Sequence, residues 1–225
     1  MRTLFHTPFD PASRLIRLVL AEKRVSARFV DTQNEDAEAL THFHPRPATP
    51  ILIDETPSGR ETAICPAWAI IEYLEEVYTH APMLPGASGA RAEVRRLIDW
   101  FCVHFDKDVA AVTRRVLINQ QHSGRTSGDD TQFSDSAEAI VWHFDYLSWL
   151  LENRAWLAGD TLTAADFAGA AYLSVIDYLD LALWTDFAAV REWYARLKSR
   201  PAFRAVLSER VEGRPPPAHY DNPDF

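Results

Sequence analysis

The amino-acid sequence predicts an α+β domain over residues 1–79, followed by an all-α domain over residues 90–212. Short apolar runs alternate with helical stretches in the first eighty residues, which is typical of a sheet covered by helices. A segment rich in Pro and Gly follows at residues 80–89 and is predicted to be a linker. No strand pattern occurs beyond it, and the Pro-rich residues 213–225 are expected to form an irregular tail.

The first domain divides into strands and helices at its turn signals. The turn residues at 55–60 separate two apolar runs, and Pro11 and Pro66 each stand at a predicted first helical turn. The predicted strands are Thr3–His6, Ala27–Asp31, Pro50–Ile53 and Glu61–Cys65, and the predicted helices are Pro11–Lys23, Glu35–Phe43 and Pro66–Tyr78. This order of elements is typical of a thioredoxin-like domain.

The second domain consists of helices with different degrees of burial. Leu162–Leu179 is almost entirely apolar and is therefore expected to be the central helix. Thr163 and Asp166 have the spacing of a capping box, with Asp in place of the usual Glu. The other predicted helices are Arg91–Val116, Asp135–Glu152, Phe187–Ser199 and Ala202–Arg210.

Composition limits the possible partners. The chain has 32 acidic and 23 basic residues and a formal charge of -9, which disfavours nucleic acid and anionic membranes as partners. No apolar run approaches the roughly 18 residues that cross a bilayer, and the first residues enter a strand pattern directly. Cys65 and Cys102 have no metal-ligand spacing. We therefore expect a cytoplasmic protein without a metal site and without membrane insertion.

Four segments, in their order and spacing, resemble the glutathione transferase superfamily. They are Asp10–Arg14 with Ile16–Leu18, Thr49–Leu52, Ala69–Leu74 and Leu162–Asp166. They match, in turn, the start of the family's first helix, its cis-proline strand, its third helix and its buried C-terminal helix. The resemblance implies a thioredoxin-like domain joined to an all-helical domain.

The resemblance also implies where a thiol-activating group would lie. In the family a Ser, Cys or Tyr near the first helix favours the glutathione thiolate, which is the nucleophile. Asp10 occupies the Ser/Cys position here, and a carboxylate would raise the pKa of a nearby thiol. Asp10 followed by Pro11 also has the pattern of a helix N-cap. Ser13 is the nearby hydroxyl that could take its place, so Asp10 and Ser13 are the two candidate catalytic residues.

The remaining glutathione positions are partly retained. Thr49 before Pro50 matches the residue whose main chain pairs with glutathione in the family. At the start of the third helix the family has an acidic residue followed by Ser, whereas this chain has Pro66 and Ala67. These two side chains cannot hydrogen-bond to the γ-glutamyl end. Glutathione is accordingly expected to bind weakly or not at all.

The two ends of the chain resemble the branch of this superfamily that acts in alphaproteobacterial cell division. That resemblance implies a homodimer that binds filaments of the tubulin-like FtsZ. The tail could supply docking anchors through Pro216, Pro217, His219, Tyr220, Asp224 and Phe225. The alternative is a tail packed on its own domain.

The favoured interpretation is a transferase-fold binding module with a degraded glutathione site. The alternative is an active glutathione S-transferase that conjugates glutathione to small electrophiles. A glutathione-dependent reductase or isomerase is a third possibility, and the absence of Cys at position 10 argues against the Cys-dependent kind. The sequence leaves open whether the protein is an enzyme.

Overall fold

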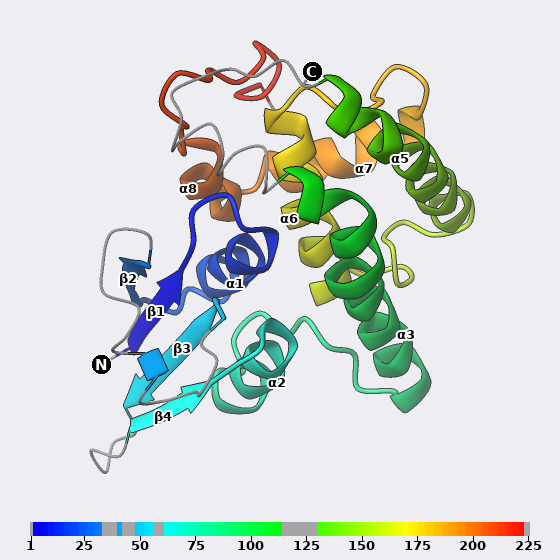
Figure 1. The fold of residues 1–225 in the computed structure, drawn as a ribbon. Helices are drawn as coiled ribbons and strands as arrows, with labels where there is room; N and C mark the ends of the chain where they lie inside the picture. The colour runs from blue at the N-terminus through cyan, green and yellow to red at the C-terminus, as the bar shows by residue number, and fades with distance from the viewer. Residues whose placement is uncertain (1, 33–39, 42–47, 56–60, 114–129, 223–225) are drawn as a thin grey trace.

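The computed structural model describes residues 2–32, 40–41, 48–55, 61–113 and 130–222, and of residues 130–135 it describes the backbone alone. A four-stranded sheet with helices against it forms the N-terminal part, and a group of helices packs beside it (Figure 1). The predicted fold class, a thioredoxin-like domain followed by a helical domain, is confirmed.

The sheet has the strand order β2-β1-β3-β4. The strands are β1 (Arg2–His6), β2 (Arg28–Asp31), β3 (Ile51–Glu55) and β4 (Glu61–Ile64). β1 is parallel to β2 and antiparallel to β3, and β3 is antiparallel to β4. Leu4 pairs with Phe29 on one side and Leu52 on the other. The apolar run that opens β3 reflects its central place in the sheet, where both of its faces are covered.

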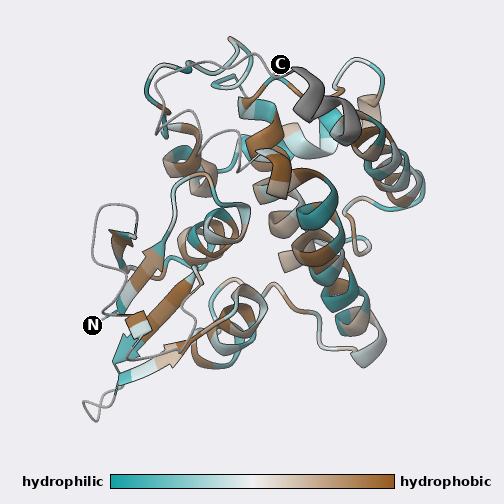
Figure 2. Ribbon diagram, in the orientation of Figure 1, coloured by the Kyte–Doolittle hydropathy of each residue, from teal (hydrophilic) through white to brown (hydrophobic). Residues whose placement is uncertain are grey.

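Two helices of the N-terminal part lie between the sheet and the helical domain: α1 (Pro11–Glu22) and α2 (Ala67–Val77) (Figure 1). α1 buries almost its whole circumference because it packs against α2 on one side and α6 on another. Brown hydrophobic stretches are seen in β1, β3 and α6 and in part of α1 (Figure 2). The helix predicted at Glu35–Phe43 lies mainly outside the described residues.

The helical part is built around α6 (Ala164–Tyr178), every residue of which is buried. Its other elements are α3 (Ser88–Asp99), η2 (Trp100–Ala110), α5 (Asp130–Leu151), α7 (Ala188–Lys198), η3 (Pro201–Phe203) and α8 (Arg204–Leu207). α3 begins inside the segment predicted as a linker. The helix predicted at Ala202–Arg210 is instead a 3-10 turn followed by one short α-helical turn.

The long helix predicted at Arg91–Val116 is not one continuous α-helix. It is α-helical up to Asp99 and continues as the π-helix η2 from Trp100 to Ala110. Buried residues recur there at intervals of four, at Phe101, Phe105 and Val109. A helix bonded five residues back has a wider turn than an α-helix, so this spacing keeps all three on one face. The same spacing also suits an α-helix, so the sequence carries no local signal for the change to η2.

The predicted capping box at the start of α6 is present. The Asp166 carboxylate accepts hydrogen bonds from the Thr163 amide at 2.8 Å and from its hydroxyl at 3.0 Å. It also accepts from the Leu157 amide at 2.8 Å and the Trp193 indole at 3.0 Å. One buried carboxylate thus ties the start of α6 to the preceding loop and to α7.

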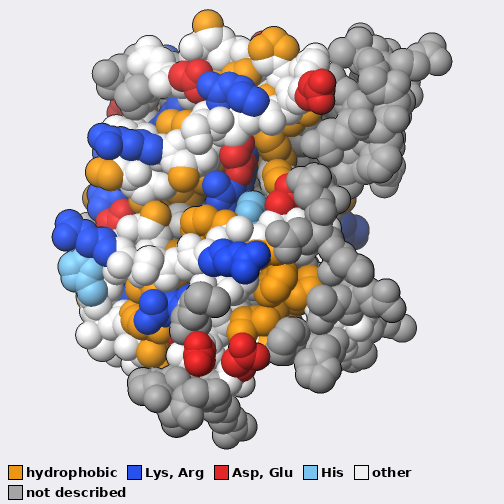
Figure 3. All heavy atoms as spheres, turned by 90° about the vertical axis from the view of Figure 1, so that its left-hand side faces the viewer, with side chains coloured by type: hydrophobic (Ala, Val, Ile, Leu, Met, Phe, Trp, Pro, Cys, Tyr) orange, Lys and Arg blue, Asp and Glu red, His pale blue; other side chains and the backbone are white. Residues whose placement is uncertain are grey.

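Charged side chains join the two parts of the molecule. The buried Arg14 guanidinium donates to Ser174 Oγ at 2.8 Å and to Glu209 Oε2 at 2.8 Å. Arg17 pairs with the same Glu209, and Arg200 pairs with Glu22. On the side of the molecule seen in Figure 3, basic and acidic side chains are interspersed. Within the described residues, no helix is long and apolar enough to cross a membrane.

Candidate functional site

The candidate site begins where β1 leads into α1. Asp10 is the N-cap of α1, and its Oδ2 accepts a hydrogen bond from the Ser13 amide at 2.8 Å. Pro11 follows at the first helical position, where a missing N–H leaves no bond unmade. The Asp10 carboxylate therefore stabilises the start of the helix at the place where the family has its thiol-activating residue.

Ser13 is fully buried in the first turn of α1. Its Oγ accepts a hydrogen bond from the Thr7 amide at 3.2 Å. The hydroxyl thus satisfies a backbone donor of the loop that enters the helix. An enclosed hydroxyl engaged in this way is poorly placed to hydrogen-bond to the thiol of a ligand.

Three threonine hydroxyls meet at the edge of the sheet beside the cis peptide bond between Thr49 and Pro50. Thr7 Oγ1 lies 2.8 Å from Thr49 Oγ1 and 3.1 Å from Thr32 Oγ1. Parallel β1 and β2 end at this edge and antiparallel β3 begins there, so the topology brings the three together. Sequence reasoning identified Thr49 but missed Thr7 and Thr32, although each directly follows a strand.

The start of α2 offers no polar side chain. Pro66 is its N-cap and follows a second cis peptide bond, after Cys65, which the sequence analysis did not anticipate. No side chain caps this helix, and Ala67 is buried. The two positions that would hold the γ-glutamyl end of glutathione therefore present apolar groups.

A cleft of about 980 Å³ opens between α2 and the α3–η2 helix. Its lining includes Pro66, Trp68 and Ile71 from one side and Ile98, Cys102 and Val103 from the other. Its charged lining residues are Glu72, Glu76, Arg95, Arg96 and Asp99. Arg95 donates to both oxygens of Glu72, at 2.7 and 3.0 Å. The cleft thus combines an apolar lining with a charged border, and the exposed Trp68 side chain lies on it.

Cys102 is not an activated nucleophile. Burial raises the pKa of its thiol to about 12, a hydrogen bond with Tyr172 opposes the rise, and the negative charges of Asp106 and Asp10 add to it. A thiol with a raised pKa carries almost no thiolate at neutral pH.

An aromatic face continues from this cleft over η2 and α5, and we define it as Trp100, Val103, Trp142, Tyr146 and Trp149. Trp100 stacks on Trp142 with ring centroids 5.2 Å apart and lies 4.4 Å from Tyr146. Tyr146 in turn stacks on Trp149 at 6.0 Å. Trp142 and Trp149 are 55% and 59% exposed, which is unusual for the largest apolar side chains. Contiguous exposed apolar surface of this kind marks interaction sites.

The described part of the tail packs on its own helical domain. Tyr220 is fully buried, and its ring meets that of Tyr178 edge to face at 5.1 Å. The Tyr178 hydroxyl donates to the Arg214 carbonyl at 2.6 Å and accepts from the Val211 amide at 2.8 Å. Pro216, Pro217 and His219 are half-buried, and Asp224 and Phe225 lie outside the described residues. Tyr220 cannot touch a partner while the tail holds this position.

A buried polar cluster holds the tail at His219. The Asp177 carboxylate accepts from Trp184 Nε1 at 3.0 Å and lies 3.0 Å from His219 Nε2. Lys198 Nζ donates to Asp177 at 3.2 Å and to the His219 carbonyl at 2.9 Å. Sequence reasoning missed Asp177 and Lys198, because both lie in helical patterns that predicted only packing.

The sheet, the cis-proline edge and the helical domain define the glutathione transferase class, and the chain belongs to the glutathione S-transferase family. It matches the family's N-terminal domain over residues 4–82 and its C-terminal domain over residues 121–210.

Among individual relatives, it is 42% identical to FtsZ-localized protein A of Caulobacter vibrioides, with 100% of this chain and 98% of that protein aligned. The solved structure of FzlA from C. crescentus is similar, with a TM-score of 0.91, 40% identity and coverage of 100% and 99% of the two chains. A crystal structure of a glutathione S-transferase from Rhodospirillum rubrum F11 gives a TM-score of 0.90 at 39% identity, with both chains covered completely.

Proposed function

We propose that this protein is a glutathione-transferase-fold binding module that associates with FtsZ filaments in the cytoplasm and does not conjugate glutathione efficiently. The observation that carries the proposal is the full-length similarity to FtsZ-localized protein A. The geometry of this chain is compatible with the proposed role, because the positions that would activate and hold glutathione serve the fold instead.

Simple energetics support a degraded glutathione site. A thiolate 4 Å from the Asp10 carboxylate would be disfavoured by about 4 kcal/mol at an effective dielectric constant of 20. Pro66 and Ala67 remove two hydrogen bonds to charged ligand groups, each worth roughly 1.5–3 kcal/mol. Those two losses alone correspond to a roughly hundredfold to ten-thousandfold weaker affinity.

The module is proposed to act as a homodimer through the aromatic face and the adjoining Trp68. A second copy would cover the exposed indoles, and the ion pairs at the cleft could form a polar rim around them. Replacing Trp142 and Trp149 by Ser should shift the protein toward the monomer in sedimentation equilibrium. Phe29→Ser is the matched control, because Phe29 is also exposed but belongs to β2. An unchanged dimer in the double variant would show that another surface joins the subunits.

Co-sedimentation with FtsZ tests the proposed partner directly. FtsZ assembled with GTP should carry the protein into the pellet, and unassembled FtsZ with GDP should leave it in the supernatant. A chain lacking residues 214–225 then tests the tail, with circular dichroism to check that the truncated domain is still folded. Absence of the full-length protein from the filament pellet would refute the proposed function.

The threonine cluster favours a second candidate, an active transferase with a displaced activating group. Thr7 and Thr49 place hydroxyls beside the cis-proline edge, where a ligand thiol would lie. Calorimetric titration with reduced glutathione and turnover of an aryl halide, each compared with Thr7→Val and Ser13→Ala, distinguish the candidates. A micromolar dissociation constant with turnover lost in either variant would establish the transferase and overturn our ranking.

A further inference from the structure

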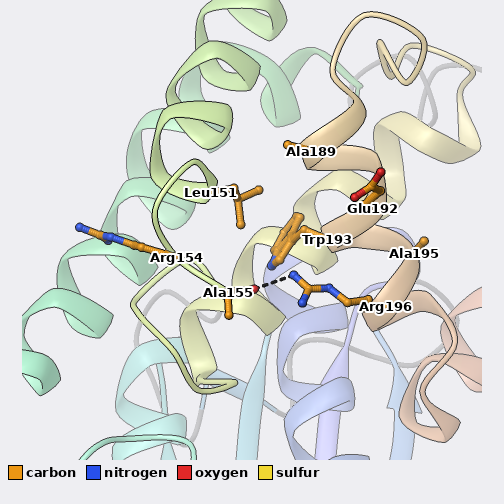
Figure 4. Close-up of a pocket in the computed structure, with 8 residues that line it drawn as sticks. All are labelled: Leu151, Arg154, Ala155, Ala189, Glu192, Trp193, Ala195 and Arg196. Carbon is orange, nitrogen blue, oxygen red and sulfur yellow. Dashed lines mark hydrogen bonds between the residues drawn. The ribbon is translucent and has the colours of Figure 1, made fainter.

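A second hollow lies away from the cleft between α2 and the α3–η2 helix. It is formed by the C-terminal end of α5, the loop that follows it and α7 (Figure 4). Its volume is about 550 Å³, which falls within the range of small-ligand sites. It is lined by Leu151, Arg154, Ala155, Ala189, Glu192, Trp193, Ala195 and Arg196. Most of these are small or apolar, so the few charges among them determine what can bind.

The Trp193 ring lies beneath this hollow and is almost completely covered. Trp193 is buried, and its Nε1 donates to Asp166 at 3.0 Å, so the ring is held in one orientation. Leu151 and Ala155 lie across from α7 in Figure 4, with the ring between them and the helix. Because the ring is covered, the apolar surface that a ligand can touch comes from Leu151, Ala155 and Ala189.

The Arg196 guanidinium is held at the edge of the hollow. One of its terminal nitrogens donates to the Ala155 carbonyl at 2.6 Å, and its central carbon lies 4.4 Å from the centre of the Trp156 ring. Within the described residues its other N–H groups have no protein acceptor. A guanidinium already fixed in place loses little freedom when it binds a carboxylate.

Glu192 lies one helical turn before Arg196 on α7. Opposite charges at this spacing normally pair on a helix surface. Over the described chain no ion pair joins the two, because Arg196 turns toward Ala155 and Trp156. Arg154 is engaged elsewhere: it donates to Glu93 at 2.8 Å and to the Leu157 carbonyl at 2.8 Å, and it points away in Figure 4. One cation and one anion thus border the same apolar hollow.

We propose that this hollow binds the ammonium and carboxylate of an α-amino acid that carries an apolar side chain. The carboxylate binds Arg196, the ammonium binds Glu192, and the side chain packs on Leu151, Ala155 and Ala189, above the covered Trp193 ring. Glutathione shares the charged α-amino acid end at its γ-glutamyl residue but has no apolar side chain beside it, so it serves as a comparison ligand.

Titration of the isotope-labelled protein with L-leucine, followed by ¹H–¹⁵N NMR, tests the proposal. We expect the Trp193 indole N–H resonance to shift with saturation. Leucinamide, which lacks the carboxylate, and N-acetyl-leucine, which lacks the ammonium, should each bind about tenfold more weakly or worse, as expected for loss of one charged hydrogen bond. Glutathione should bind more weakly than leucine.

Matched variants assign the two charges. Arg196→Gln should weaken leucine binding about tenfold but leave leucinamide binding unchanged. Glu192→Gln should also weaken leucine binding about tenfold, but it should leave N-acetyl-leucine binding unchanged. Arg204→Gln, an exposed arginine on α8 outside the hollow, is the control and should bind like the unmodified chain. Unchanged spectra elsewhere confirm folding of each variant. No shift with millimolar leucine, or equal binding of all three ligands, would overturn the proposal.

Discussion

Replacement of Tyr220 by Ala measures how firmly the tail is docked. The ring is fully buried against Tyr178, and its hydroxyl donates a long hydrogen bond of 3.4 Å to the Val206 carbonyl and interacts with the Arg14 guanidinium. Burial of an aromatic side chain covers about 150–250 Å², which is worth roughly 4–6 kcal/mol at 25 cal/mol per Å². Measured large-to-small losses are about 3–5 kcal/mol. Because a terminal segment relaxes easily, we expect about 3 kcal/mol.

Urea unfolding at equilibrium provides the assay. Tyr220→Phe keeps the ring and loses the contacts of the hydroxyl with Val206 and Arg14, so it should cost about 1–2 kcal/mol, less than Tyr220→Ala. Pro215→Ala changes an exposed residue of the same segment and should be nearly neutral. A loss below about 1 kcal/mol for Tyr220→Ala would refute the reasoning, because it would mean that the ring is not packed on α6 in solution.

Three further substitutions test buried groups. Burial lowers the pKa of His6 to about 4, below its usual 6.5, so the unfolded chain takes up a proton first as the pH falls. The free energy of unfolding in urea should therefore be about 2 kcal/mol lower at pH 5 than at pH 7 because of this group, and His6→Gln should reduce this difference. The same dependence on pH in both proteins would contradict the prediction. Asp166→Asn places an amide donor among four donors and should lower the free energy of unfolding by about 2–4 kcal/mol, measured in the same way. An unchanged free energy would argue against this set of hydrogen bonds. A Cβ at Gly169 would lie 2.8 Å from Phe101 and 2.9 Å from Trp193. Gly169→Ala should therefore destabilise the protein by about 1–3 kcal/mol, although Ala has the better helix propensity. A raised melting temperature would contradict this packing.

The elements that the sequence predicted well are those with local signals. Asp10 and Pro11 mark the start of α1, and Thr163 and Asp166 mark the start of α6, because a cap depends on residues within one turn. The apolar run over α6 predicted its central position for a similar reason. The predicted domain bounds at residues 79 and 90 stay predictions. Helix α3 begins at Ser88, within the predicted linker.

The site was only partly predictable. The resemblance led to Asp10, Ser13 and Thr49, but it did not reveal that Ser13 is enclosed or that Thr7 joins Thr49. Both facts depend on which strand ends meet at one edge of the sheet. The tail was left with two alternatives, and the described part lies on its own domain through Tyr220.

The sequence by itself determined the order of helices and strands, the caps, and the apolar side chains that needed partners. Only the tertiary structure decided which tryptophans are covered: Trp193 is buried, whereas Trp142 and Trp149 face outward, although all three lie in similar helical patterns. The physical reason is the sequence separation over which each kind of interaction acts. Caps and helical periodicity act over a few residues, whereas burial depends on contacts such as that of Asp177 with His219, 42 positions apart in the chain.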